Sequence, residues 1–163
     1  MSIVNAKASV GQLTNYSKRL VAESMYAKGK SFVGAALLLR KRGGYEYVVL
    51  HLMCQGVEIV LKAILLYRNY DSYKKRLKKD FGHNLEKLVT EVLDEFGFDS
   101  LEEDVAMELK NLNSLYSEHL LRYGSFHDRL VNPSSIASRL VLRKIYAAIR
   151  LCDRSLAKGK DMI

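Results

Sequence analysis

The chain has 163 residues, of which 48% are hydrophobic and 27% charged, and this balance excludes a disordered protein and fits one globular domain. A single proline and long stretches without turn residues favour helices over strands, and two cysteines exclude a disulfide framework or a zinc knuckle. The net charge of +8 indicates either a polyanionic partner such as nucleic acid or a domain that is simply basic.

The first predicted helix covers residues 13–41. Gly29 and Gly34 are expected to kink or split it, because glycine disfavours a helix interior. The cationic run Arg40–Arg42 suits the negative end of the helix dipole, and Gly43 follows it as a stop signal.

A central helix is predicted over residues 45–70, and it is apolar on nearly all sides, which indicates burial among other helices. Its polar residues fall at steps of four, three and four and form one narrow line: His51, Gln55, Glu58 and Lys62. This polar line is either a solvated strip with a Glu58–Lys62 pair, or the wall of a polar cleft or dimer interface. It also makes a membrane span costly, and residues 1–5 lack the features of a secretion signal, so a cytoplasmic location is expected.

Residues 71–81 are predicted to be a basic connector, with four lysines available to an RNA backbone: Lys74, Lys75, Lys78 and Lys79. A third helix is then expected from Leu85 to Phe96, where apolar residues repeat at helical spacing. Asn84 suits its N-cap position, and Gly97 should end it.

A fourth helix is predicted from Ser100 to Tyr123, with Glu103 completing a capping box and Gly124 breaking the helix. A fifth opens at Asn132-Pro133, where asparagine caps and proline takes the first helical position. Its expected inner face is Ile136, Leu140, Val141, Ala148, Leu151 and Cys152, and its outer face carries Arg139, Arg143, Arg150 and Arg154.

No repeat and no second domain is apparent in the sequence. We therefore predict an all-α fold, an up-and-down bundle of about five helices, formed by residues 1–163 as a single domain with a core over about 13–156.

Neither a metal site nor a cofactor is expected. The segment Lys28-Gly29-Lys30-Ser31 resembles the end of a phosphate-binding P-loop, but Ser24 stands where the first glycine of that motif should fall. The four histidines (His51, His83, His119 and His127) lack the spacing of metal ligands on a helix.

The segment from Arg122 to His127 is the strongest candidate for chemistry. Gly124 lets the chain fold back, so that the arginine and the histidine can face one phosphate. Arginine offers a fixed cationic fork for phosphate oxygens, and histidine moves protons near neutral pH. These two groups are the minimum for cleaving RNA through its own 2′-hydroxyl without a metal.

The order of these elements resembles the HEPN family of helical domains, over roughly residues 13–156. The resemblance lies in the long second helix, in Leu121-Arg122-Tyr123, in a long last helix, and in two segments: Glu58-Ile59-Val60-Leu61-Lys62-Ala63-Ile64-Leu65 and Gly82-His83-Asn84-Leu85-Glu86-Lys87-Leu88. Many HEPN proteins are metal-independent endoribonucleases of toxin–antitoxin, phage-defence or RNA-processing systems. Their motif is an arginine, four to six residues and a histidine, and two copies meet across a homodimer.

The resemblance implies roles for individual residues. Arg122 would hold the scissile phosphate and His127 would act as general acid or base, giving a 2′,3′-cyclic phosphate and a 5′-hydroxyl. Tyr123 and Ser125 would add hydrogen bonds, and Glu58 would orient Arg122 or His127. The basic residues named above, on the connector and the last helix, would hold the RNA backbone.

Tyr123 departs from the polar residue that usually follows the arginine in HEPN nucleases. This form resembles a HEPN branch that binds a nucleotide or nucleic acid, or dimerises, so a non-catalytic module that binds RNA, a nucleotide or a partner protein is the alternative. A third hypothesis is an antitoxin-like partner that acts with a nucleotidyltransferase.

Overall fold

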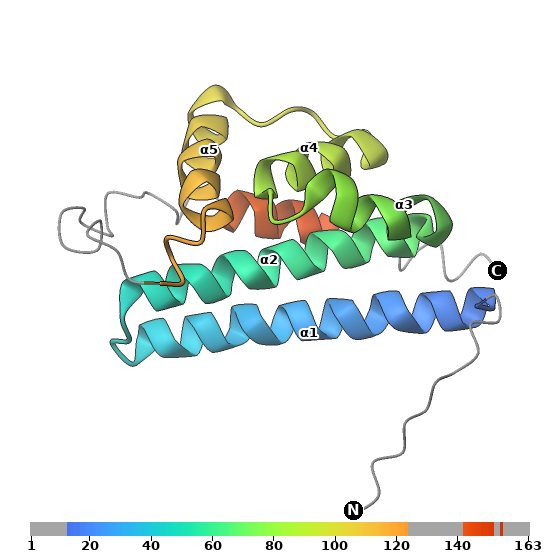
Figure 1. The fold of residues 1–163 in the computed structure, drawn as a ribbon. Coiled ribbons are helices and arrows are strands. Elements are labelled where there is room, and N and C mark those ends of the chain that lie inside the picture. Colours follow the sequence, from blue (N-terminus) through green and yellow to red (C-terminus); the bar gives the residue numbers. More distant parts are fainter. Residues whose placement is uncertain (1–12, 124–141, 152–153, 155–163) are drawn as a thin grey trace, which may run out of the picture.

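The computed structural model describes residues 13–123, 142–151 and 154, and within these ranges the protein is an all-α helical bundle without strands (Figure 1). The predicted all-α class is therefore confirmed. The helices are α1 (Asn15–Lys41), α2 (Glu46–Arg68), α3 (Tyr70–Arg76), the π-helix η1 (Leu77–Phe81), α4 (Leu85–Phe96), α5 (Glu103–Ser117) and a further helical segment over residues 142–151.

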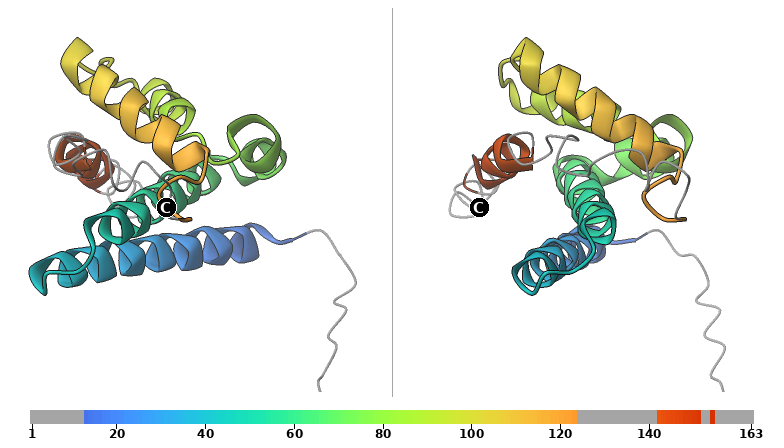
Figure 2. Two further views of the ribbon diagram at one scale, coloured as in Figure 1. Left: turned by 60° about the vertical axis from the view of Figure 1, so that its left-hand side comes forward. Right: turned by 90° about the vertical axis from the view of Figure 1, so that its left-hand side faces the viewer.

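Helices α1 and α2 form an antiparallel pair that lies side by side over its whole length (Figures 1 and 2). The predicted kink in α1 is wrong, because the helix runs unbroken from Asn15 to Lys41. Gly29 instead lies against Gly56 of α2: a Cβ built on either glycine would lie 2.9 Å from the carbonyl oxygen of the other. The two glycines therefore let the backbones of α1 and α2 approach closely.

Helix α2 is the centre of the core, as predicted. Its fully buried side chains include Leu50, Ile64 and Leu65. Helices α4, α5 and the 142–151 segment pack on the side of α2 that faces away from α1 (Figure 1). Helix α5 is steeply inclined to α2 rather than parallel to it, so the packing departs from a regular up-and-down alternation (Figures 1 and 2).

By length and composition, α2 is also the one helix among the described residues that could cross a membrane, with a mean hydropathy of 1.8. In the structure, 67% of its most apolar stretch is buried against other parts of the fold. Core helices of globular proteins meet the same criteria, so this property is weak evidence for a membrane span.

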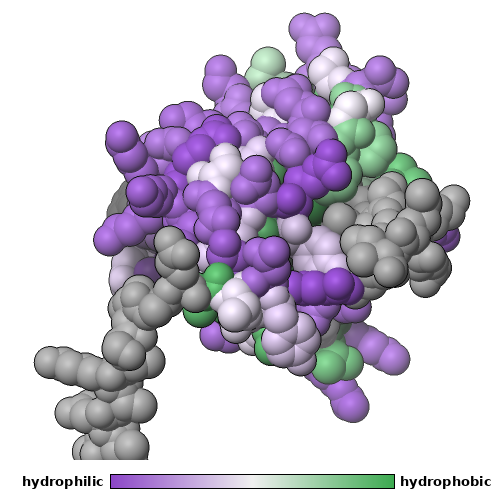
Figure 3. Space-filling view, turned by 90° about the vertical axis from the view of Figure 1, so that its right-hand side faces the viewer, coloured by the Kyte–Doolittle hydropathy of each residue, from purple (hydrophilic) through white to green (hydrophobic). Residues whose placement is uncertain are grey.

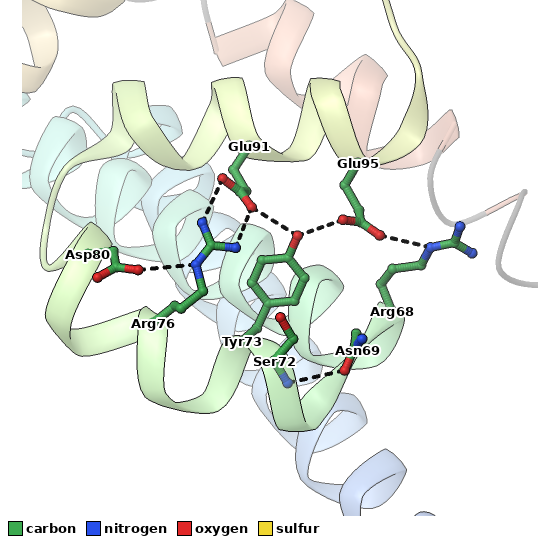
Figure 4. A network of polar contacts seen from close by, with 8 residues as sticks. All are labelled: Arg68, Asn69, Ser72, Tyr73, Arg76, Asp80, Glu91 and Glu95. Atoms are coloured by element: carbon green, nitrogen blue, oxygen red, sulfur yellow. Dashed lines mark hydrogen bonds and ion pairs between the residues drawn. The ribbon is translucent and has the colours of Figure 1, made fainter.

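The predicted connector over residues 71–81 is wrong, because α3 and η1 make this region helical. Figure 4 shows why the helices dock on α4. The guanidinium of Arg76 donates to both carboxylate oxygens of Glu91, at 2.7 and 3.1 Å, and the Tyr73 hydroxyl donates to Glu91 and Glu95. The four predicted lysines (Lys74, Lys75, Lys78 and Lys79) are all exposed, at an end of the molecule whose surface is mostly hydrophilic (Figure 3).

Both predicted boundaries of α4 are confirmed. The Asn84 side chain accepts a hydrogen bond from the Lys87 backbone nitrogen at 2.9 Å, and Gly97 ends the helix with φ at 64°. Replacing Asn84 by alanine is expected to lower the free energy of unfolding by about 1 kcal/mol, measured by urea denaturation. Asn84→Asp retains the acceptor and should stay close to wild type; an equal loss in both variants would contradict the capping role.

Helix α5 differs from its predicted bounds at both ends. It begins at Glu103 after Glu102, which makes no side-chain cap hydrogen bond, so the predicted capping box at Ser100 is absent. It ends at Ser117 instead of Tyr123. Val105, Leu112 and Tyr116 of α5 face the core.

The segment over residues 142–151 is helical as predicted, but its inner face differs. Leu142, Ile145 and Ile149 are buried, whereas Leu151, which was expected inside, is exposed. These three large aliphatic residues are spaced as i, i+3 and i+7, so they lie on one face of the helix. This face is more apolar than the predicted inner face. Arg143, Arg150 and Arg154 are exposed, as predicted.

Candidate functional site

The polar line on α2 meets α4 and α5 at a buried carboxylate. Glu58 is only 6% exposed, so the interpretation of this line as a solvated strip is wrong at its centre. Its Oε1 accepts from Lys62 Nζ at 2.6 Å, and its Oε2 accepts from the Tyr116 hydroxyl at 2.6 Å. Lys62 also donates to the Gly82 carbonyl just before α4. Glu58 thus connects three segments that are far apart in the sequence.

The surroundings of this carboxylate fix its charge. Burial alone would raise the pKa of Glu58, but the hydrogen bonds from Lys62 and Tyr116 and the positive charge of Lys62 outweigh it and hold the pKa below its ordinary value. Burial and the neighbouring carboxylate raise the pKa of Tyr116. At neutral pH Glu58 is therefore ionised and Tyr116 is a hydrogen-bond donor.

His83 is the imidazole best arranged for proton transfer. Its Nδ1 lies 3.1 Å from Glu58 Oε2, while 52% of its side chain is exposed. A carboxylate that binds one imidazole nitrogen orients the ring and leaves the other nitrogen to accept or release a proton. The Glu58–His83 pair has this arrangement, and Nε2 of His83 has no hydrogen-bond partner in the part of the chain that the structure describes.

Two more imidazoles lie close to this pair. The His119 ring centre is 5.5 Å from that of His83, and the His51 ring centre is 5.9 Å from that of Tyr116. Burial lowers the pKa of His51, and its electrostatic interactions with Arg122 and His119 lower it further, against the opposing effect of Glu58. His51 is therefore uncharged at neutral pH, and Arg122 is close enough to influence it.

The turn after α5 carries both His119 and Arg122. The backbone nitrogen of His119 donates to the Tyr116 carbonyl and that of Leu120 donates to the Leu115 carbonyl, which is the pattern of a Schellman helix end. His119 has φ of 62° at the left-handed position that glycine usually occupies. The backbone nitrogen of Arg122 then donates to the His119 carbonyl oxygen at 3.0 Å, and this hydrogen bond closes the turn.

We call the group Glu58, Lys62, His83, Tyr116, His51, His119 and Arg122 the imidazole cluster. Of the predicted catalytic and supporting residues, the structure brings Glu58 and Arg122 into it. Tyr123 is 67% exposed beside it, with the Arg122 guanidinium 5.9 Å from its ring centre. Ser125, His127 and Arg139 lie outside the described residues.

The sequence predicts that Glu58 orients Arg122 or His127, and His127 lies outside the described residues. Within the described part of the chain, the hydrogen-bond partners of Glu58 are Lys62, Tyr116 and His83, and Arg122 is not among them. Glu58 therefore positions His83 rather than Arg122. No local pattern predicts these contacts, because His83 and Tyr116 are 25 and 58 positions away from Glu58.

Arg143 and Arg150, two of the predicted RNA-binding arginines, lie on another side of the molecule. Arg143 and Arg150 border a groove whose wall includes Met53 and Val57 of α2. At 100° per residue, Met53 and Val57 point about 170° and about 130° away from the mean direction of the polar line around the α2 axis. The 142–151 segment and the turn after α5 accordingly flank α2 on different sides (Figure 2, right). The structure does not bring these arginines together with Arg122.

Comparisons with known proteins give no family for this chain: no family model matches it, and neither the curated proteins nor the solved structures yield a match. Within the described residues, no group of three or more His, Cys, Asp or Glu side chains is placed to hold a metal ion. Chemically, the imidazole cluster offers one guanidinium for an anion and several imidazoles for proton transfer.

Proposed function

We propose that this protein is a metal-independent endoribonuclease that acts as a homodimer, in a toxin–antitoxin or defence system. The observation that carries the proposal is the arrangement of His83, which is oriented by Glu58 and lies 5.5 Å, ring centre to ring centre, from His119 in the Arg122 turn. Guanidinium and imidazole groups together suit the cleavage of a phosphodiester.

The proposed reaction is an attack of the RNA on itself. One imidazole removes the proton of the 2′-hydroxyl, the 2′-oxygen bonds to phosphorus, and the bond to the 5′-oxygen breaks as a second imidazole protonates that oxygen. Arg122 binds the phosphate oxygens and stabilises the charge that develops on them. The HEPN resemblance assigns one proton transfer to His127, and the structure supports His83 or His119 for the other.

The test is RNA cleavage by the purified protein in the presence of a chelator, with Arg122→Ala and His127→Ala assayed beside wild type. Each variant is expected to cleave about 10²–10⁴-fold more slowly, and the wild-type products should be a 2′,3′-cyclic phosphate and a 5′-hydroxyl. Lys110→Ala removes an exposed positive charge from α5 and should cleave like wild type. A wild-type protein that cleaves no RNA, or two variants that cleave at full rate, would refute the proposal.

His119→Gly separates catalysis from folding. Glycine accepts the left-handed backbone at this position more readily than histidine, so the variant should be at least as stable as wild type. If the imidazole takes part in the reaction, cleavage should nevertheless fall by about 10²-fold or more. Full activity in a stable His119→Gly protein would remove His119 from the mechanism.

One observation favours a second candidate, a non-catalytic RNA-binding module. Arg143 and Arg150 line a groove on another side of α2, and Arg154 and the four lysines are exposed, so several basic groups are available to an RNA backbone without taking part in proton transfer. RNA binding that weakens steeply as salt increases, without cleavage by the wild-type protein, would support this module.

A further inference from the structure

A groove of about 460 Å³ lies between α1, α2 and the 142–151 segment, and its lining includes no residue of the imidazole cluster. This volume is within the range of about 300–1,000 Å³ that is typical of small-molecule sites. Its apolar lining comes from all three elements: Val33, Leu37, Met53, Val57, Leu142 and Ala147.

Three arginines also border the groove. Arg40 is bound to Glu46 through its Nη2, but its Nε is buried and has no hydrogen-bond partner among the described residues. Arg143 and Arg150 are exposed, and neither forms an ion pair with a residue of the described part. Arg143 and Arg150 therefore place two guanidinium groups at the groove that have no carboxylate partner among the described residues, and the groove suits a ligand that brings an anionic oxygen to them.

The chemistry of the lining distinguishes two anionic ligands of suitable size. A nucleotide would place its base, whose edge carries several polar atoms, against aliphatic side chains. Apart from the arginines, Tyr146 is the only polar side chain among the described residues of the lining, and next to these residues most of the polar base atoms would lose their hydrogen bonds. An aliphatic chain has no polar atoms to satisfy and gains from burial against the same surface.

We propose that this groove binds a free single-chain aliphatic carboxylate of the fatty-acid class, with its chain along the apolar lining and its carboxylate at Arg143 and Arg150. The proposal is independent of the proposed ribonuclease activity, because it uses none of the residues of the imidazole cluster.

The absence of tryptophan from the chain provides a direct assay. Tyr146→Trp places a single indole at the groove, and its fluorescence should change on titration with dodecanoate at monomeric concentrations and saturate at one ligand per chain. Calorimetry of the wild-type protein should give the same stoichiometry, which controls for the substitution. Dodecanol and dodecyltrimethylammonium, which have the same chain without the negative charge, should bind at least about tenfold more weakly.

Matched variants test the site itself. Arg150→Ala should weaken dodecanoate binding about tenfold, whereas Arg154→Ala, which removes the same charge from an exposed residue absent from the groove lining, should bind like wild type. Ala147→Phe fills the groove from an exposed position and should abolish binding while the circular dichroism spectrum stays unchanged.

Three results would overturn the proposal. They are no saturable binding of dodecanoate, equal binding of dodecanol, and an equal loss in Arg150→Ala and Arg154→Ala. The last experiment measures binding of the protein to anionic phospholipid vesicles. Binding to vesicles that Ala147→Phe leaves intact, with no binding of monomeric dodecanoate, would show that the basic face associates with a membrane surface and that the groove is not the site.

Discussion

Replacing Glu58 by alanine is expected to lower the free energy of unfolding by about 3–5 kcal/mol, because one partner of a buried ion pair is removed. The Lys62 side chain is only 13% exposed, so its charge would lose its carboxylate partner in a poorly solvated position. The buried Tyr116 hydroxyl would lose its acceptor at the same time. The change should appear as a lower urea midpoint at neutral pH with an unchanged denaturant slope.

Glu58→Gln is the matched control for this prediction. Glutamine has nearly the same shape and keeps a carbonyl oxygen that can accept from Tyr116, but it does not balance the charge of Lys62. The expected loss is smaller, about 1–3 kcal/mol. If alanine and glutamine cost the same, the hydrogen bond to Tyr116 contributes nothing, and if neither change matters, the carboxylate does not hold α2, α4 and α5 together.

The same carboxylate predicts a pH dependence. The pKa of Glu58 is lower in the folded protein than its ordinary value of 4.5, so the folded state favours the ionised form. This contribution to stability is present above about pH 4.5 and is lost as the pH falls through the lower pKa of the folded state. Glu91, whose pKa Arg76 lowers, acts in the same direction. Stability should therefore fall in acid in wild type, and less steeply in Glu58→Gln, which retains only the Glu91 contribution of these two.

The helices could be predicted where local signals and burial agree. The run of apolar residues identified α2, and Asn84 and Gly97 marked both ends of α4 because capping depends on neighbouring residues. The prediction of a connector over residues 71–81 was wrong because this segment has many lysines and only a few apolar residues at helical spacing. Tyr73 and Phe81 are buried eight positions apart and pack onto the fold from a segment that is otherwise polar.

The candidate site could be predicted only in part. Arg122 and Glu58 were identified from the sequence, but the end of α5 was placed six residues too late because Gly124 looked like the stop signal. In the structure, His119 takes the left-handed position after the helix, where glycine is usual. No local sequence pattern predicts a histidine there. His83 and Tyr116 join Glu58 through long-range contacts, which depend on how α4 and α5 pack on α2.

Replacing Gly56 by alanine is expected to destabilise the fold by about 1–3 kcal/mol, even though alanine is the better helix former. A Cβ at Gly56 would lie 2.7 Å from Val33 Cγ2 and 2.9 Å from both the Gly29 oxygen and the Val33 nitrogen. Two of these three atoms belong to the backbone of α1, so no side-chain rotation relieves the contact. The two helices would have to move apart, which would loosen the packing of α2 along the pair.

Gly34→Ala provides a control with the opposite sign. Gly34 also lies inside a helix of this pair, but a Cβ there would meet no atom within 4 Å. The substitution should therefore stabilise the protein by about 0.5–1 kcal/mol through helix propensity alone. Urea denaturation of both variants decides the matter: a lower midpoint for Gly56→Ala with a higher one for Gly34→Ala shows that close backbone approach, and not helix flexibility, explains glycine at position 56. A stabilised Gly56→Ala protein would mean that α1 and α2 are not in such close contact.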